Sequence, residues 1–361
     1  MSKPRARDLG IPFSGVTGSF NAITDVPGVE VGMTTLISGE GEYAIRTGVT
    51  TIWPRARHAS GLLSERVVPA AWFSLNGCGE MTGTAWVEES GTLSSPIALT
   101  NTHSVGVTHD AVIRWGRDHG WDEKFSLPVV AETYDGFLND INGFHVKSEH
   151  VYAALENATS GPVLEGNVGG GTGMVVARFK GGTGSSSRRI ESSLDDSRLT
   201  PYTVGVLVQA NYGARADLLI RGVPVGLEIT DFMPEDPSRK DGSIIIVVAT
   251  DAPLLPHQLK RLAKRAGMGL ARTGSNAYNG SGDLFIAFSS AMPRLEDGLN
   301  HWRALPESSL DPVFRATADA SEEAIINALV AAETMTGFQG HTVHALPIDR
   351  LLEVMRRYNR I

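Results

Sequence analysis

One hydroxyl group stands at the boundary between a polar stretch and an apolar stretch of this chain. Residues 234–242 are polar and rich in turn-forming types, and Ser243 is followed by the mostly β-branched run Ile244–Val248. Such a run, bounded by turn residues, is typical of a strand buried on both faces. We therefore expect Ser243 at the mouth of a central strand.

A serine in this position suits one particular chemistry. The hydroxyl of Ser243 can attack the carbonyl of Gly242, and glycine tolerates the backbone torsions that this requires. Hydrolysis of the resulting ester would cut the chain and leave Ser243 as a new N-terminus. Its α-amine, which titrates at about 7.7–8.0, could then act as general base for its own hydroxyl. By itself, Asp-Gly-Ser before a strand is more often a simple turn.

A second polar loop lies further along the chain. Residues 273–283 gather hydroxyls, amides and a carboxylate ahead of the apolar run Leu284–Phe288. Ser281 and Asp283 are two residues apart, so on an extended backbone their side chains point the same way. A carboxylate beside a hydroxyl can orient an amine or relay a proton. Without further context, a Ser-Gly-Asp loop is more often structural.

Composition limits the classes of protein to consider. The chain has 361 residues, a net charge of −8 and no Lys/Arg stripe, which argues against a nucleic-acid partner. Cys78 is the only cysteine, which excludes an intrachain disulfide and a thiolate metal cage. We see no secretion signal and no apolar run near the ~20 residues needed to cross a bilayer. We expect a soluble cytoplasmic protein without a membrane partner.

Other catalytic chemistries find little support. His341 and His344 have no carboxylate at helical register, so we expect an incidental pair, no bound metal and no cofactor. The stretch 166–174 lacks both the Walker A ending and the last glycine of a dinucleotide fingerprint, and is better explained by close backbone packing. Cys78 is a conceivable nucleophile, but a lone cysteine beside glycine is more often a buried apolar residue.

The remaining pattern mixes strands and helices without a linker, which favours one large layered domain. Val175–Phe179 reads as a strand, 180–198 as a loop or hairpin tip, and Tyr202–Ala210 as a strand that delivers Asn211 at its end. Further strands are expected at 48–54 and 69–75. Helices are expected from Thr108 to about Gly120, from Ser148, from Pro256, from an Asp319/Glu322 capping box to Gly337, and over 347–358.

A series of blocks in this order resembles a known family. They are Asp25–Val29, Arg46–Ile52, Thr102–Gly106, Glu165–Met174, Asp241–Ser243 and Asn279–Asp283. The chain resembles the self-processing aminopeptidases that include the L-aminopeptidase/D-esterase and the β-peptidyl aminopeptidases. The resemblance extends over about residues 8 to 355.

The resemblance implies a fold, a processing step and an activity. The fold is a single four-layer αββα sandwich over residues 1–361, similar to N-terminal-nucleophile hydrolases but with different strand connectivity. The precursor is cut between Gly242 and Ser243 into chains 1–242 and 243–361, which stay together, commonly in a homotetramer. Such enzymes remove N-terminal residues from short peptides, amides or esters, including D-alanyl and β-aminoacyl substrates.

The resemblance also assigns roles to individual residues. Ser243 matches the nucleophile, and Ser281 and Asp283 match the residues that orient it and its amine. Asn211 matches the oxyanion-stabilising amide, and Tyr134 the tyrosine near the substrate amine. Some β-peptidases carry Glu where this chain has Asp283.

Two other functions stay open at this stage. One is an acyltransferase of the related fold that passes an acyl group to an amine, although such relatives typically use Thr as nucleophile. The other is a non-catalytic binding or assembly protein that keeps the fold. The natural substrate, its chirality and the general base, either the α-amine or Ser281, are not given by the sequence.

Overall fold

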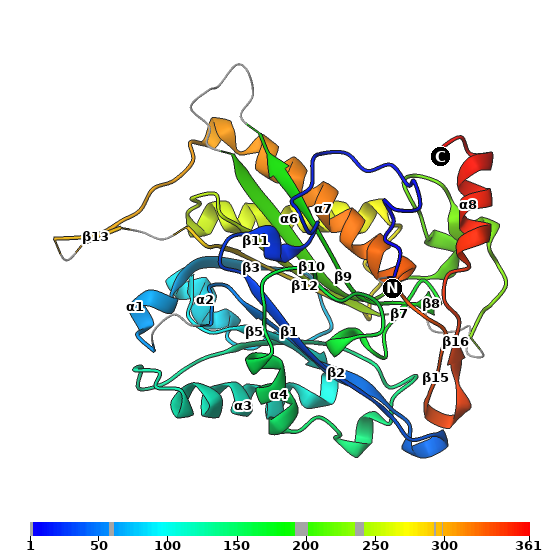
Figure 1. Cartoon of the computed structure of the whole chain (residues 1–361), viewed down its shortest axis with the longest axis horizontal. Coiled ribbons are helices and arrows are strands. Elements are labelled where there is room, and N and C mark those ends of the chain that lie inside the picture. Colours follow the sequence, from blue (N-terminus) through cyan, green and yellow to red (C-terminus); the bar gives the residue numbers. More distant parts are fainter. Residues whose placement is uncertain (1–2, 58–60, 192–200, 235–241, 292–293, 298) are drawn as a thin grey trace.

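Two β-sheets lie face to face, and helices cover the outer face of each (Figure 1). The computed structural model describes residues 3–57, 61–191, 201–234, 242–291, 294–297 and 299–361. The four layers of helices, sheet, sheet and helices are the αββα sandwich that the sequence led us to expect.

The first sheet has six strands, and its two central strands are parallel. Its order is β4 (Thr92–Leu93), β3 (Val68–Gly77), β12 (Gly282–Ser289), β11 (Ser243–Thr250), β10 (Tyr202–Asn211) and β9 (Gly182–Ile190). Only β11 and β12 run parallel, and every other neighbouring pair is antiparallel. Helices α6 (Pro256–Arg272) and α7 (Asp311–Val330) cover the outer face of this sheet (Figure 1).

The second sheet has four strands. Its order is β1 (Glu30–Ser38), β2 (Ile45–Trp53), β5 (Ile97–Asn101) and β6 (Val129–Thr133), with β5 and β6 parallel. Helices α3 (Val105–Asp118) and α4 (Ser148–Glu156) pack on its outer face. Shorter elements complete the chain: α1 (Leu63–Arg66), α2 (Thr84–Ser90), β7 (Val175–Val176), β8 (Phe179–Lys180), α5 (Val225–Glu228), β13 (Arg294–Glu296), β14 (Leu299–His301), β15 (Met335–Thr336), β16 (Thr342–Val343) and α8 (Ile348–Arg357).

Strand β11 is buried on both faces, which confirms the prediction from its apolar run. Ile244, Ile246 and Val248 belong to the core under α6 and α7. Ile245 and Val247 belong to the core between the two sheets. Because side chains alternate along a strand, Ser243 faces the space between the sheets, as Ile245 does.

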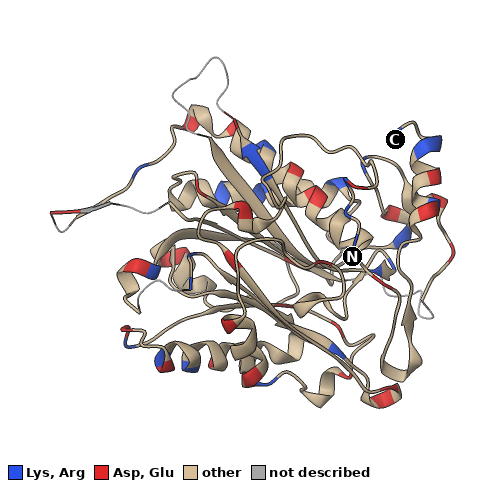
Figure 2. Ribbon diagram, viewed as in Figure 1, with Lys and Arg blue, Asp and Glu red and all other residues tan. Residues whose placement is uncertain are grey.

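Residues of both charge signs are interspersed along the helices and loops (Figure 2). The basic outer face of α6, for example, is matched by acidic partners on other elements: Lys260 pairs with Glu88, and Arg261 with Glu307. This face is therefore a solvated surface and not a patch of one sign.

The predicted start of helix α7 was wrong. It begins at Asp311, with Pro312 in its first turn, eight residues before the capping box predicted at Asp319. Asp319 and Glu322 lie inside the helix, where both form ion pairs with Arg272. The helix ends at Val330 and does not reach Gly337. The acidic residues that suggested a cap instead join α7 to α6.

The segment after residue 180 was also predicted wrongly. Instead of a loop, Gly182–Ile190 is an ordered strand in which Ser185, Ser186 and Ser187 are buried. Their polarity is accommodated by hydrogen bonds, such as that from Ser185 Oγ to the Val206 carbonyl at 2.7 Å. Residues 192–198 of this prediction lie outside the described residues.

Two smaller boundaries differ as well. The predicted strand Val175–Phe179 is a tight hairpin of β7 and β8, turned by Ala177 and Arg178 with φ of 48° and 65°. Helix α3 begins at Val105, so Thr108 lies within it and is not its cap.

Candidate active site

Ser243 lies at the end of the first sheet where β10 stops and the central strands β11 and β12 begin. This end of the sheet is called the Ser243 edge below. Ser243 is the first residue of β11, only 6% exposed, and pairs with Asn211 of β10 on one side and Gly282 of β12 on the other. The Gly282 N–H donates to Ser243 Oγ at 3.1 Å. This bond fixes the hydroxyl oxygen, which therefore has a defined direction before any substrate binds.

Gly242 sits where no larger residue fits. A Cβ added there would lie 2.1 Å from the Asn211 carbonyl oxygen and 2.7 Å from the Cα of Tyr212. Gly242, whose carbonyl forms the bond to Ser243, therefore packs directly against the end of β10. The residues before it, 235–241, lie outside the described part of the chain.

Ser281 and Asp283 form the contact that their spacing predicted. Ser281 Oγ donates to Asp283 Oδ1 at 2.7 Å, and both side chains are buried. Burial raises the pKa of Asp283 to about 6, although the bonds from Ser281 and from the Ile244 backbone oppose that rise. Among the described residues no group hydrogen-bonds to the second oxygen, Oδ2.

The side chain of Asn211 is held at both ends. Its Oδ1 accepts from the Val175 N–H at 2.8 Å, and its Nδ2 donates to the Tyr134 carbonyl at 3.0 Å. Because a carboxamide nitrogen carries two hydrogens, one remains to bind another acceptor. Tyr134 follows β6 and is 39% exposed. Its hydroxyl packs closely against Gly136, where a Cβ would lie 2.3 Å from it.

Glu132 is a residue that the sequence reasoning missed. It lies on β6, two residues before Tyr134, and is only 3% exposed. Its Oε1 accepts from the Glu80 N–H at 3.1 Å, and its Oε2 accepts from the hydroxyl of Thr102. Burial raises the pKa of this carboxyl, while these two hydrogen bonds lower it.

Glu132 lies close to the Ser243 end of β12. A Cβ built on Gly79 would be 3.3 Å from Glu132 Oε1 and 3.2 Å from the Cα of Gly282. One carboxylate from the second sheet thus reaches the edge of the first sheet. The signal in the sequence was a lone acidic residue in an otherwise apolar strand, together with Thr102 in one of the blocks quoted above.

The glycine-rich stretch 166–174 packs its backbone against both sheets, as expected. A Cβ on Gly170 would lie 2.7 Å from the Leu99 carbonyl oxygen and 2.0 Å from Gln209 Oε1. Lys180, which is fully buried, donates to the carbonyls of Met174 at 2.8 Å and Gly181 at 3.1 Å. Burial lowers the pKa of Lys180 to about 7. Val175, whose N–H orients Asn211, follows this segment directly.

The two closely spaced histidines pack against aromatic rings. His341 stacks on Phe137 with ring centroids 4.4 Å apart, and His344 meets Phe232 edge-on. Within the described ranges, no three His, Cys, Asp or Glu side chains gather closely enough to hold a metal ion.

Cys78 is exposed, so its prediction as a buried residue was wrong. Its backbone N–H donates to the Ser281 carbonyl at 3.2 Å. None of the described helices has the length and apolarity to span a membrane.

This fold, with a serine at the start of a central strand, matches solved structures over nearly its whole length. One is the L-aminopeptidase D-Ala-esterase/amidase of Ochrobactrum anthropi, a prototype of the serine aminopeptidases with a variant of the Ntn hydrolase fold. It is 47% identical, with a TM-score of 0.91 over 99% of both chains. A β-aminopeptidase of a Burkholderia species is 45% identical, with a TM-score of 0.88 over 98% of this chain and 99% of the other.

The comparisons of sequence agree with those of structure. The β-peptidyl aminopeptidase BapA of Sphingosinicella microcystinivorans is 50% identical, and the match covers 99% of this chain and 93% of that protein. BapA of Sphingosinicella xenopeptidilytica is 46% identical, with 99% and 92% covered. The fold and these relatives define a hydrolase of the serine aminopeptidase class, and they do not favour an acyltransferase or a binding protein.

Within that class, residues 21–343 match peptidase family S58. The chain belongs to this family.

Proposed function

We propose that the chain cuts itself between Gly242 and Ser243 and then works as an aminopeptidase with Ser243 as its N-terminal nucleophile. The observation that carries the proposal is the convergence of Ser243, Asn211 and the hydrogen-bonded Ser281–Asp283 pair at one sheet edge. A nucleophile, an amide donor and an orienting carboxylate are the parts that acyl transfer requires.

In the self-cleavage step, Ser243 Oγ attacks the carbonyl carbon of Gly242. The C–N bond breaks, the nitrogen of Ser243 takes a proton, and Gly242 becomes an ester of the hydroxyl. Water then hydrolyses the ester, which gives chains 1–242 and 243–361. The close packing of Gly242 against the end of β10 supports this step because it holds the scissile carbonyl in place beside Ser243.

In the aminopeptidase reaction, Ser243 Oγ attacks the substrate carbonyl while its own α-amine or Ser281 takes the proton. The Nδ2 of Asn211 and a backbone N–H stabilise the oxyanion. The amine leaves, and water hydrolyses the acyl-enzyme. Asp283 holds Ser281 through Oδ1, and its second oxygen is suited to accept a hydrogen bond from the α-amine that cleavage creates.

We assign recognition of the substrate's ammonium group mainly to Glu132, with Tyr134 beside it. The resemblance pointed to Tyr134 near the substrate amine, and from the sequence we had expected Asp283 to be its charged partner. Asp283, however, already accepts from Ser281, and on β12 it pairs with Ile244, whose side chain belongs to the core under α6 and α7. Glu132 reaches the same edge from the opposite sheet, and a buried carboxylate is a strong partner for an ammonium ion.

The substrates that we propose are short peptides, amides and esters with a free amino group. The relatives are named for β-peptidyl, L-aminoacyl and D-alanyl substrates, and we propose that this chain accepts members of these classes. We further propose a homotetramer of the cleaved unit in the cytoplasm. A single cysteine, which needs no oxidising compartment, is consistent with that location.

The test combines denaturing electrophoresis with hydrolysis of an L-alanyl anilide. Wild type should give two bands and be active, whereas Ser243→Ala should stay at full length and be inactive. Ser308→Ala, an exposed serine far along the chain from this edge, is the matched control and should behave as wild type. A Ser243→Ala protein that is cut, or that keeps its activity, would refute the proposal.

A further inference from the structure

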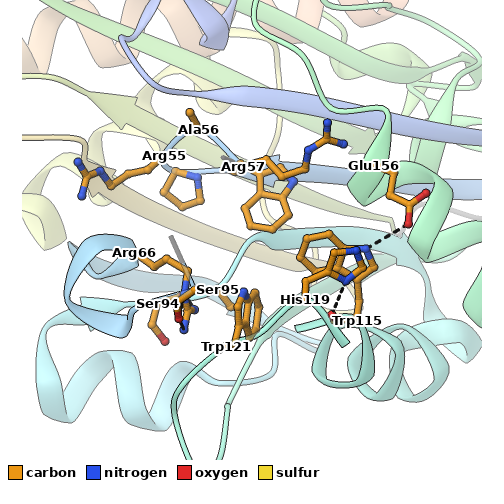
Figure 3. Close-up of a pocket in the computed structure, with 13 residues that line it drawn as sticks. Arg55, Ala56, Arg57, Arg66, Ser94, Ser95, Trp115, His119, Trp121 and Glu156 are labelled. Atoms are coloured by element: carbon orange, nitrogen blue, oxygen red, sulfur yellow. Dashed lines mark hydrogen bonds between the residues drawn. The ribbon is translucent and has the colours of Figure 1, made fainter. Parts of the chain in front are cut away.

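A cleft of about 480 Å³ opens beside the second sheet, and Figure 3 shows the residues that line it. The segment that carries Arg55, Ala56 and Arg57 lies on one side of the opening. On the other side lie Arg66, Trp121 and His119 (Figure 3). A volume of this size is in the range of small-molecule sites, which run from roughly 300 to 1,000 Å³.

The base of the cleft is aromatic. Trp115 meets Trp53 and Trp121 edge-on, with ring centroids 5.3 and 6.3 Å away, and the ring of His119 stacks on it at 3.7 Å. The N–H groups of Trp53 and Trp115 donate to the Leu155 carbonyl and to Glu156. With those polar edges bound, the indoles present mainly carbon to the cleft, which suits a flat ring.

The rim carries two arginine side chains that form no ion pair among the described residues. Arg66 is paired with Glu123 and lies over the Trp121 ring, so its charge is already balanced. The guanidinium groups of Arg55 and Arg57 donate to the backbone carbonyls of Glu65 and Leu155, and no ion pair joins either of them to an acidic residue in the described part of the chain. The Glu30 carboxylate accepts from the backbone N–H of Arg57 at 3.1 Å. The carboxylate of Glu156 lies at one end of the rim, where it accepts from the indole of Trp115.

We propose that this cleft binds a small planar acid, with its ring against the indoles and His119 and its carboxylate or phosphate beside Arg55 or Arg57. Arginine is well suited to such groups because its planar fork binds two oxygens at once. The aromatic base supplies the affinity for the ring, and the arginines select the charged form over its neutral analogue.

The cleft is separate from the Ser243 edge. It is lined by Trp53 at the end of β2 and by Ser95 ahead of β5, whereas Tyr134 and Asn211 meet beyond the other end of β5 and β6. The five residues of β5 span roughly 13 Å at about 3.3 Å per residue. A ligand in the cleft would therefore not contact the nucleophile.

The experiment is calorimetric titration of the wild-type protein with four probes. These are 1-naphthyl phosphate, 1-naphthoate, 1-naphthol and inorganic phosphate. We expect one molecule of at least one acid to bind, about tenfold or more tighter than naphthol and inorganic phosphate, because each of these lacks one of the two contacts. The two acids distinguish a phosphate site from a carboxylate site. An absence of saturable binding, or equal affinity for naphthol, would overturn the proposal.

Paired variants locate the binding. Arg55→Gln with Arg57→Gln should weaken acid binding about tenfold or more. Arg114→Gln with Arg117→Gln removes the same charge from the exposed face of α3 and should leave it unchanged. Both proteins should keep the anilide hydrolysis of wild type, which shows that they fold. Unchanged binding in the first pair, or electron density for the naphthyl ring at Ser243 in a soaked crystal, would contradict the assignment.

Discussion

Asn211 and Ser243 are direct partners in the antiparallel pair of β10 and β11, so the nucleophile and the amide donor belong to one rigid unit. Because Val175 and the Tyr134 carbonyl also fix the amide, its orientation does not depend on bound substrate. Such preorganisation is what makes an oxyanion donor effective.

Replacing Asn211 with Ala should lower kcat by ~10²–10³, the typical cost of losing one oxyanion donor. KM should change much less, because the donor acts mainly in the transition state. Steady-state kinetics on an L-alanyl anilide measure both constants. Asn157→Ala, which removes an amide that binds the Met33 backbone, is the control and should keep wild-type kcat. A large rise in KM with unchanged kcat would contradict the assigned role.

Replacing Gly242 with Ala should slow or abolish self-cleavage. A Cβ at this position would lie 2.1 Å from the Asn211 carbonyl oxygen, so the scissile bond would have to move. Electrophoresis of freshly made protein over time measures the uncut fraction. Gly106→Ala is the matched control, because a Cβ there meets nothing within 4 Å. Cleavage of Gly242→Ala at the wild-type rate would show that this contact is unimportant.

The rate should fall as the pH drops through about 6. Burial raises the pKa of Asp283 to about 6, and a protonated carboxyl can no longer accept hydrogen bonds through both oxygens from Ser281 and the α-amine. The profile of kcat/KM against pH should show this acid limb, and Asp283→Asn should be slower and lack it. If the α-amine is the base, a second limb should appear near 7.7–8.0. Survival of the limb near 6 in Asp283→Asn would assign it to another group.

The same shift predicts a small effect on stability. The folded protein holds the Asp283 proton up to about pH 6, whereas the unfolded chain releases it near 3.8. Between these values the native state binds more protons, so this group makes the free energy of unfolding decrease as pH rises. Denaturant titrations at pH 4.5 and 7 should differ less for Asp283→Asn than for wild type. An equal difference in both proteins would argue against the shift.

Replacing Glu132 with Gln should raise KM for substrates with a free amine by about 10- to 100-fold, as expected for a lost charge-assisted contact. An N-acetylated ester, which has no ammonium group, should be affected far less. Glu80→Gln provides the control, because it is the exposed neighbour whose backbone N–H, not side chain, binds Glu132. Equal effects of Glu132→Gln on both substrates would assign Glu132 a structural role.

The sequence predicted the features that depend on local pattern. The β-branched run after Ser243 and the spacing of Ser281 and Asp283 gave a buried strand and a real hydrogen bond. Glu132 could not be found in this way, because its position depends on how the second sheet packs across the first. Strand β9 was missed for a related reason: Ser185 to Ser187 look like loop residues until tertiary hydrogen bonds bury them.

The most direct measurement is the intact mass and N-terminal sequence of the active wild-type protein, with the acyl-enzyme trapped by a slow ester substrate. We predict two chains, 1–242 and 243–361, with the second beginning Ser-Ile-Ile and carrying the acyl group. A fully active preparation whose chain is unbroken between Gly242 and Ser243 would contradict the account.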